Sequence, residues 1–250
     1  MVEYKRVVLK FGGSVISDGN AIGRVANLIK NISEKYKIMA VVVSAMGKTT
    51  DGLDKLAHNI APTPDKRELD ALLATGEMQS AALLAMRLNA IGVPARSYNA
   101  WQCGIITDNN FGNAKIEHTN CEFVNPLYGV PVVTGFQGVT KHNDITTLGR
   151  EGSDISAVTV TGVLCADFCW FFKDGGGIYN KSPKENLDAQ LFKEISYTKM
   201  LELMRENKSH VLHKSSVELA QICRIPLFVS GLDNPKYGTW IKKRVHPKVH

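Results

Sequence analysis

Short apolar runs alternate along this chain with longer segments in which apolar residues recur every three or four positions. The short runs predict β-strands, and the longer periodic segments predict α-helices. Strands are expected at residues 7–10, 39–44, 95–98, 115–117, 131–135, 169–172, 226–230 and 239–241. Helices are expected at residues 20–35, 66–91, 154–164, 195–206 and 215–223, the second of them interrupted at Thr75-Gly-Glu77. This alternation predicts an α/β fold, a three-layer α/β/α sandwich with a mainly parallel central sheet.

Polar residues stand at the carboxyl ends of four predicted strands. They are Lys10, Ser44, Thr134 and Lys173. In open α/β sheets, ligands bind outside the carboxyl ends of the strands. We therefore expect a binding site at this edge of the sheet, flanked by a flexible polar loop at residues 140–150.

Composition fits one large domain, which we place at residues 1–241, followed by a basic tail at 242–250. Of the 250 residues, 44% are hydrophobic and 8% aromatic, enough to build a full core and to exclude global disorder. The net charge of +6 comes partly from the tail, for which a solvated end is a better interpretation than nucleic-acid binding. A basic balance also suits polyanionic substrates.

Cysteine usage points to a reducing compartment, and hydropathy points to a protein without a membrane-spanning helix. The five cysteines are odd in number and mostly have apolar neighbours, and no zinc-ligand spacing is present. No apolar run reaches the ~18 residues that a membrane helix needs, and the N-terminus has no signal-peptide pattern. We expect a soluble cytoplasmic protein that binds neither membranes nor nucleic acid.

The segment Thr147-Leu-Gly-Arg-Glu-Gly-Ser-Asp154 carries the strongest chemical signal. Glycines let the backbone approach a ligand, and the start of a helix offers unpaired N–H groups to an anion. Arg150 can clamp a carboxylate or phosphate with two hydrogen bonds. A capped turn with Ser153 or Asp154 as N-cap is the structural alternative.

Two further segments suit phosphate binding. In Lys10-Phe-Gly-Gly-Ser14, the N–H groups of Gly12 and Gly13 can face phosphate oxygens while Lys10 supplies charge. The alternative is a surface lysine before a tight turn. Gly47-Lys-Thr-Thr50 is not a P-loop, because the first glycine of that motif would fall inside a strand.

Other polar groups suit a small substrate and a nucleotide. The hydroxyls of Ser44, Thr49 and Thr50 could contact a polar substrate, or could cap a helix or turn. Glu77 could receive an ammonium group or act as a cap. In the glycine-rich run 173–184, Tyr179 could pack on a nucleotide and Lys181 or Lys184 could reach phosphates, although such turns are common.

Together these segments resemble the catalytic domain of aspartate kinase (aspartokinase), in the amino acid kinase family. The likeness spans residues 5–241. Its blocks occur in the family's order: Lys10-Phe-Gly-Gly-Ser14, Val43-Ser-Ala-Met-Gly47, Thr75-Gly-Glu77, Gln102-Cys-Gly-Ile-Ile-Thr-Asp108, Pro131-Val-Val-Thr-Gly-Phe-Gln-Gly138, Thr147-Leu-Gly-Arg-Glu-Gly-Ser-Asp154, Ile195-Ser-Tyr197 and Val211-Leu-His213.

The resemblance implies ATP-dependent phosphorylation of the L-aspartate side chain to 4-phospho-L-aspartate, a first step toward lysine, threonine or methionine. It further implies ATP as a cofactor together with Mg²⁺, which we expect to be carried chiefly by ATP, with no metal held by the protein alone. We also expect a homodimer, because closed two-fold assemblies are the commonest among soluble proteins. The implied catalytic residues are Lys10 and Asp154. The implied substrate-binding residues are Ser44, Thr49, Thr50, Glu77 and Arg150. The implied nucleotide-binding residues are Lys10, Gly12, Gly13, Ser14, Lys173, Asp174, Tyr179 and Lys184.

Several residues depart from the family's pattern. The nucleotide loop usually reads Thr-Asp-Val-Asp-Gly-Val-Tyr, where this chain has Lys173-Asp-Gly-Gly-Gly-Ile-Tyr179. Glu151 replaces a glycine, Lys184 an arginine and His210 a lysine, and the run after Gly13 is one residue shorter. These changes put nucleotide affinity and choice in question more than the reaction type.

Typical members continue into paired ACT regulatory domains, for which this chain leaves no room, so we expect a catalytic domain without them. Two alternatives stay open. The acceptor could be another amino acid or a small phosphate or carbamate, or the chain could be a degenerate kinase that serves as a regulatory or binding subunit.

Overall fold

The computed structural model describes residues 5–121, 124, 126–150, 152–181, 183, 186, 188–206 and 211–243. Its helices are α1 (Gly19–Ser33), α2 (Thr49–Ile60), α3 (Lys66–Ala90), α4 (Gly152–Val163), α5 (Tyr197–Arg205), α6 (Lys214–Cys223) and the 3-10 turn η1 (Pro126–Tyr128). Its strands are β1 (Arg6–Phe11), β2 (Lys37–Val43), β3 (Ala95–Tyr98), β4 (Ile105–Thr107), β5 (Ile116–Thr119), β6 (Val130–Thr134), β7 (Gln137–Thr140), β8 (Ile145–Thr147), β9 (Phe168–Phe172), β10 (Glu194–Ile195), β11 (Leu227–Ser230) and β12 (Gly238–Ile241). None of the helices in this described part is long and apolar enough to cross a membrane.

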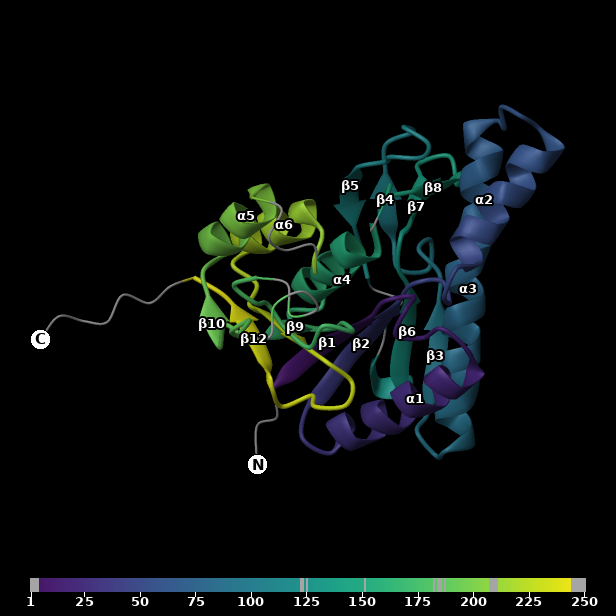
Figure 1. The fold of residues 1–250 in the computed structure, drawn as a ribbon. Helices are drawn as coiled ribbons and strands as arrows, with labels where there is room; N and C mark the ends of the chain where they lie inside the picture. Colours follow the sequence, from purple (N-terminus) through teal and green to yellow (C-terminus); the bar gives the residue numbers. More distant parts are fainter. Residues whose placement is uncertain are drawn as a thin grey trace, which may run out of the picture.

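The central sheet has eight strands in the order β10-β12-β11-β9-β1-β2-β6-β3 (Figure 1). Every neighbouring pair is parallel except β11 and β12. The predicted mainly parallel sheet is therefore confirmed. The topology places the middle strands β9, β1, β2 and β6 side by side, so their carboxyl ends form one continuous edge.

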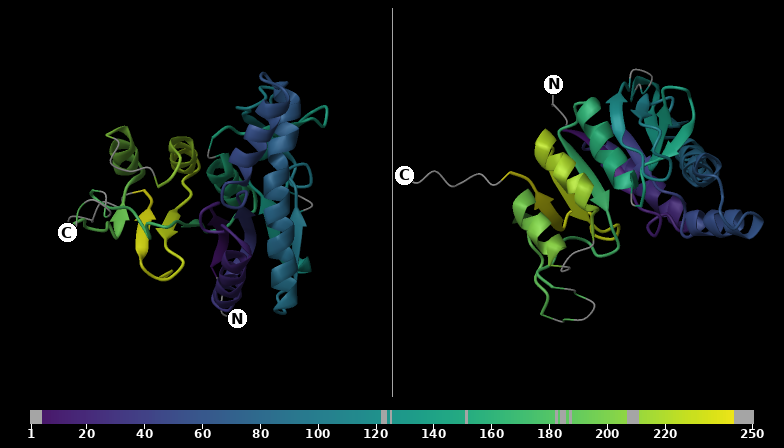
Figure 2. Two further views of the ribbon diagram at one scale, coloured as in Figure 1. Left: turned by 45° about the vertical axis from the view of Figure 1, so that its right-hand side comes forward. Right: turned by 90° about the horizontal axis from the view of Figure 1, so that it is seen from above.

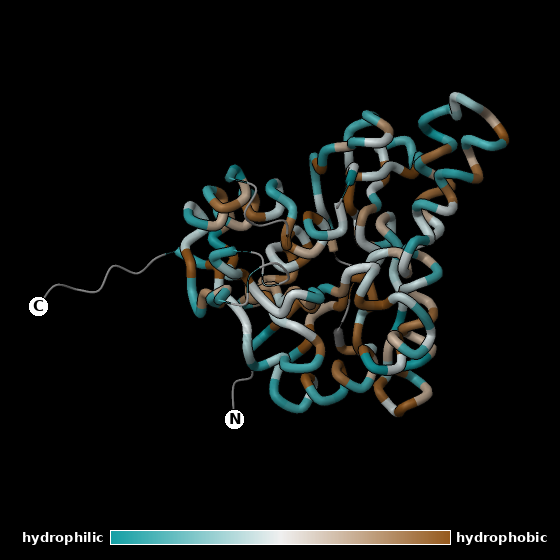
Figure 3. The backbone as a smooth tube through the Cα atoms, viewed as in Figure 1, coloured by the Kyte–Doolittle hydropathy of each residue, from teal (hydrophilic) through white to brown (hydrophobic). Residues whose placement is uncertain are grey.

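Helices cover both faces of this sheet. Successive strand residues point to opposite sides, so the apolar residues of one strand pack against helices on both faces. In β1, Val7, Leu9 and Phe11 pack with α1 and α3 on one face. Val8 packs with α4, α5 and α6 on the other. Figure 2 shows α3 well separated from α5 and α6, and in Figure 3 hydrophobic segments run along the central strands. The three-layer sandwich is confirmed, and the alternation turns Lys10 toward α4.

A second sheet, which the sequence did not predict, has the order β5-β4-β7-β8. Strand β8 lies within residues 140–150, where we expected a flexible polar loop, and that prediction is wrong. The hydroxyls there are buried and satisfied inside the protein: Thr146 Oγ1 bonds Thr107 Oγ1 at 2.6 Å, and Thr147 Oγ1 donates to Asp70 Oδ1 at 2.7 Å. Polar residues with such partners can form a buried strand.

Helix α3 runs unbroken through Gly76, so the predicted interruption at residues 75–77 is also wrong. Glycine weakens a helix by only about 1 kcal/mol relative to alanine, which tertiary packing can offset. A Cβ at Gly76 would lie 2.8 Å from the Cβ of Ala45, so the glycine permits close approach of α3 to the residue after β2.

Two other differences concern helices. Helix α2 was not predicted at all, and Ile195, which was expected to begin a helix, belongs to strand β10. That helix, α5, starts at Tyr197, where the Ser196 side chain accepts a hydrogen bond from Lys199 N and acts as the N-cap.

Candidate active site

Polar groups from the four middle strands meet at the carboxyl edge of the central sheet. Lys10 lies near the end of β1, Ser44 directly follows β2, Thr134 ends β6 and Lys173 directly follows β9. The structure thus places the four strand-end residues at one edge of the sheet, although the Thr134 hydroxyl donates to Gln137 Oε1 at 2.8 Å and lines neither cavity described below. The start of α4 lies beside them, because the Ser44 and Ser153 hydroxyls share a hydrogen bond of 2.7 Å.

Asp154, in the first turn of α4, holds two lysines at once. Lys10 Nζ lies 2.6 Å from Asp154 Oδ1, and Lys173 Nζ lies 3.0 Å from Oδ2. The backbone N–H of His213 also donates to Oδ2, at 3.3 Å. Lys10 and Asp154 are buried, with exposed side-chain fractions of 3% and 1%. Four separate segments therefore fix one carboxylate and two ammonium groups.

Burial and pairing oppose each other in this cluster. Burial lowers the pKa of Lys10, while Asp154 raises it and Lys173 lowers it further, and the pKa ends below its ordinary value. Burial alone would raise the pKa of Asp154, but the charges of Lys10 and Lys173 outweigh it and hold that pKa below its ordinary value. Asp154 is therefore an ionised carboxylate at neutral pH, occupied by lysines and unsuited to remove a proton.

Glycines shape the turn beside Lys10. After β1, Gly12 O accepts hydrogen bonds from Val15 N and Ile16 N, and Gly13 O accepts one from Gly47 N at 3.0 Å. A Cβ on Gly13 would lie 2.6 Å from Ala45 O, so only glycine fits where the loops after β1 and β2 touch. The turn is therefore compact, which allows its backbone to approach a ligand closely.

Glu77 is a buried carboxylate with one free oxygen. From the middle of α3 it accepts a hydrogen bond from Ala45 N on Oε1 at 2.9 Å, whereas Oε2 has no hydrogen-bond partner in the part of the chain that the structure describes. Burial raises the pKa of Glu77 from its ordinary 4.5 to about 7. A buried, unsatisfied carboxylate oxygen in a cavity wall is suited to a cationic ligand group.

A cavity of about 590 Å³ joins these groups. The predicted catalytic, substrate-binding and nucleotide-binding residues that line it are Lys10, Gly12, Gly13, Ser14, Ser44, Thr50, Glu77, Arg150, Asp154 and Lys173. Thr49 is not among the lining residues; its methyl group lies 3.5 Å from where a Cβ on Gly76 would be. Thr49, the first residue of α2, therefore packs close to Gly76 of α3, and its contact with the substrate stays a prediction.

Arg150 is the exposed cation of this cavity. Its side chain has no hydrogen-bond or ion-pair partner among the residues described. It precedes α4, whose first turn also lines the cavity. A free guanidinium next to a helix N-terminus suits an anionic ligand group.

A second cavity, of about 700 Å³, adjoins the first through the shared lining residues Ser14 and Lys173. It also contains Asp174 and Tyr179, which the sequence assigned to nucleotide binding. The predicted nucleotide residue Lys184, like Glu151 and His210, lies outside the described residues. Two joined cavities with Lys173 at their junction can hold two ligands end to end.

Several lining residues of the first cavity were not assigned to the site from the sequence, among them Asp70, Phe136 and Ser153. Asp70 Oδ2 accepts from Gly112 N and Thr147 N, which ties α3 to the second sheet. Phe136 has a positive φ of 69° and donates its N–H to Ser156 Oγ in α4. Asp70 gave no signal in the sequence, whereas Phe136 stands within a motif block and Ser153 was considered only as an N-cap.

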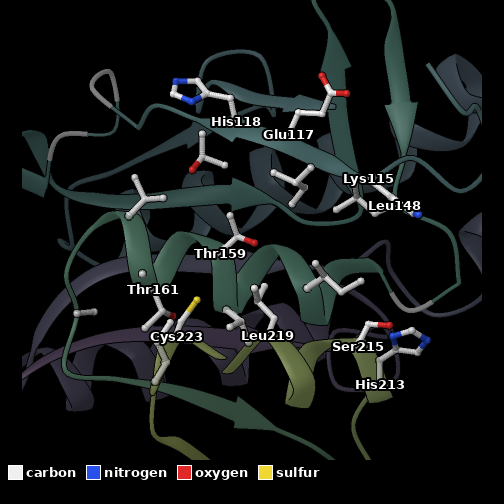
Figure 4. A pocket seen from close by; sticks show the side chains of 18 of the residues that line it. Lys115, Glu117, His118, Leu148, Thr159, Thr161, His213, Ser215, Leu219 and Cys223 are labelled. Atoms are coloured by element: carbon white, nitrogen blue, oxygen red, sulfur yellow. The ribbon is translucent and has the colours of Figure 1, made fainter. Parts of the chain in front are cut away.

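A third hollow, of about 1260 Å³, lies on the other side of Arg150. Figure 4 shows side chains that line it, among them Glu117 and His118 of β5, Thr159 of α4 and Leu219 of α6. It lies away from the lysine cluster, which is absent from its lining. We assign it no ligand.

The strand-edge site, with two lysines on one buried carboxylate, glycine turns and a helix N-terminus, defines an α/β protein built to bind anionic groups. The chain belongs to the Amino acid kinase family, whose sequence pattern matches residues 5–230.

Relatives within this family are similar over nearly the whole chain. The aspartokinase of Geobacillus stearothermophilus is 42% identical over 248 residues, which cover 98% of this chain and 60% of that protein. Aspartokinase 2 of Bacillus subtilis is 40% identical, covering 95% of this chain and 59% of the relative. This chain therefore spans about three fifths of the length of these curated relatives.

Solved structures agree with the fold. The crystal structure of aspartate kinase from Synechocystis superposes with a TM-score of 0.85 at 39% identity, covering 97% of this chain and 40% of that one. Aspartokinase III of E. coli, in complex with aspartate and ADP, gives a TM-score of 0.85 at 22% identity, with 97% of this chain and 65% of that chain covered. The second likeness supports the fold alone.

Proposed function

We propose that this chain transfers the γ-phosphoryl group of ATP to the side-chain carboxylate of L-aspartate, giving 4-phospho-L-aspartate and ADP. The observation that carries the proposal is the presence, in one cavity, of Glu77 Oε2 and the Arg150 guanidinium, neither of which has a partner among the described residues. An α-amino acid carries an ammonium and a carboxylate, and this pair complements both charges. The similarity to aspartokinases supports the same acceptor.

The reaction needs no general base. An aspartate side chain has a pKa near 3.9, so it is already a nucleophilic carboxylate at pH 7. One of its oxygens forms a bond to the γ-phosphorus while the bond from that phosphorus to the β,γ-bridging oxygen breaks, and the electron pair stays on ADP. The site must align two anions and stabilise charge on the transferring oxygens.

The residues at the carboxyl edge suit that task. We assign Lys10 and the backbone of Gly12 and Gly13 to the phosphoryl oxygens, and Asp154 to the orientation of Lys10. Ser44 and Thr50 line the aspartate pocket, while Ser14, Lys173, Asp174 and Tyr179 face the nucleotide. Lys184 stays assigned to the nucleotide by resemblance only.

Magnesium is part of the proposal as a partner of ATP. In the described chain, no three His, Cys, Asp or Glu side chains lie close enough to hold a metal ion, and the oxygens of Asp154 are taken by lysines. This donor set fits an ion bound chiefly by phosphate oxygens, with the exposed Asp174 and Asp233 as carboxylates that line the nucleotide cavity. When bound, Mg²⁺ would neutralise phosphate charge.

We further propose that the chain acts in the cytoplasm as a homodimer, since two-fold assemblies are the commonest among soluble oligomers. The degenerate-kinase alternative is disfavoured because Lys10, Arg150 and Asp154 are retained and lie together at one cavity. The test is an ATP-dependent hydroxamate assay with L-aspartate, L-glutamate and other carboxylate acceptors. Product with L-aspartate far above the others is expected, whereas a preference for another acceptor would assign the fold a different substrate.

A further inference from the structure

Lys173 differs from Lys10 in its access to ligands, although both ammonium groups bind the same carboxylate. Lys173 Nζ lies 3.0 Å and 3.3 Å from the two oxygens of Asp154. The side chain of Lys173 is 21% exposed, against 3% for Lys10. Lys173 also lines both the substrate and the nucleotide cavity. Its ammonium therefore stands where the contents of the two cavities meet.

The backbone holds Lys173 firmly in this place. Its N–H donates to Ser230 O at the end of β11 at 2.9 Å, and its carbonyl accepts from Gly176 N at 3.1 Å. Because β9 is paired with β1 on one side and β11 on the other, the residue after β9 cannot drift from the sheet edge. Lys173 is thus pre-positioned rather than a mobile surface lysine.

The charges in the cluster show what Lys173 adds. The buried pair of Lys10 and Asp154 is neutral by itself, since Asp154 is ionised. With the ammonium group of Lys173 added, the net charge of Lys10, Asp154 and Lys173 together is +1. A site that must stabilise negative charge on a transferring phosphoryl group needs that surplus in a place the group can reach.

The charge at this position also distinguishes the chain from the pattern it resembles. That pattern has threonine as the first residue of the nucleotide loop, where this sequence has Lys173. A hydroxyl can donate one hydrogen bond but carries no charge. The positive charge at the junction of the cavities is therefore a property of this chain.

We infer that Lys173 is a second catalytic lysine, whose ammonium contacts an oxygen of the γ-phosphoryl group during transfer while Asp154 fixes its position relative to Lys10. This inference rests on the proposed phosphoryl transfer. Lys173 donates hydrogen bonds and keeps its proton, so bonds and electrons balance as in the transfer itself. Its role differs from simple nucleotide binding, because the contact strengthens as charge develops on the transferring oxygens.

The test compares steady-state kinetics of Lys173→Met, Lys173→Arg and Lys173→Thr with the wild type, with ATP and L-aspartate varied separately. Lys199→Met is the matched control, because Lys199 lies on α5 and pairs with the exposed Glu202. Lys173→Met should lower kcat about 100- to 1,000-fold, the effect of losing one transition-state donor, and should change both KM values less than about threefold. The kcat of Lys173→Arg should be at least about tenfold higher than that of Lys173→Met, and the control should retain wild-type kinetics.

Three outcomes would overturn the inference. A raised KM for ATP with unchanged kcat would make Lys173 a nucleotide contact only, and unchanged kinetics would remove it from the site. Equal losses of kcat in the Met and Arg variants, together with a lowered melting temperature in both, would make its role structural. If Lys173→Met does not fold, Lys173→Thr gives the same comparison with a residue that the pattern itself has there. Wild-type activity with L-aspartate tests the proposed function separately, since the variant-to-wild-type ratio can be measured with any acceptor that the wild type phosphorylates.

Discussion

The substitution Glu77→Gln tests the central binding group of the site through both stability and activity. Glutamine keeps the acceptor for Ala45 N and places a neutral amide where the unpartnered Oε2 now lies. Burial raises the pKa of Glu77 from 4.5 to about 7. Because the folded-state pKa exceeds the unfolded one, ionisation destabilises the fold, and stability is lost as pH rises from about 4.5 to about 7.

The size of this loss follows from the same values. At about 1.4 kcal/mol for each factor of ten, a rise from 4.5 to about 7 corresponds to roughly 3 kcal/mol. Between pH 5 and pH 8, the free energy of unfolding of wild-type protein should therefore fall by roughly 2–3 kcal/mol relative to Glu77→Gln. Urea denaturation at both pH values measures this difference, and Glu68→Gln, an exposed position on the same helix, is the control.

Activity should respond in the opposite direction. A substrate ammonium binds the ionised carboxylate, so kcat/KM for L-aspartate in the wild type should fall as pH drops below about 7. Glu77→Gln should lose this pH dependence and raise the KM for L-aspartate about 100-fold, as expected for a broken buried ion pair. Identical pH profiles of stability and kcat/KM in wild type and variant would refute the role of Glu77.

Three further changes give separate tests. Lys10→Ala should lower kcat about 100-fold or more while the KM for L-aspartate changes little, and a lost affinity with unchanged kcat would contradict its role on the transferring group. Arg150→Lys should raise the KM for L-aspartate roughly tenfold, because lysine cannot form a bidentate clamp, and an unchanged KM would remove Arg150 from the substrate pocket. Gly76→Ala should lower the free energy of unfolding by about 1–3 kcal/mol, because its Cβ would lie 2.8 Å from Ala45 Cβ, whereas Gly52→Ala in α2, with no atom within 4 Å, should stabilise the protein in the same denaturation assay.

The sequence predicted the central sheet because its strands are continuous apolar runs buried on both faces. Strands β1, β2, β6 and β9 each showed this pattern, and the polar residues at their ends marked the edge where the site lies. Because β9, β1 and β2 are neighbouring parallel strands, the residues at their carboxyl ends, Lys10, Ser44 and Lys173, lie close together. The roles of these residues stay proposals.

Local patterns could not predict features that depend on partners far along the chain. The strands of the second sheet are short and rich in threonine, and their hydroxyls are satisfied by Asp70 and by one another. The continuity of α3 at Gly76 depends on its contact with Ala45, which is remote in sequence. The resemblance placed Asp154 near Lys10, but for the same reason the contact between Asp154 and Lys173 was not predicted. The division at residues 241 and 242 stays a prediction, since residues 244–250 lie outside those that the structure describes.

The chemical identity of the product tests the central claim most directly. Wild-type protein would be incubated with ATP, Mg²⁺ and L-aspartate, and any acyl phosphate reduced with borohydride, which converts the phosphorylated carboxyl group to an alcohol. Phosphorylation of the side chain predicts homoserine as the reduced product, formed only when ATP is present. Formation of 3-amino-4-hydroxybutanoate, which marks the α-carboxylate, or of no reduced product would contradict the account.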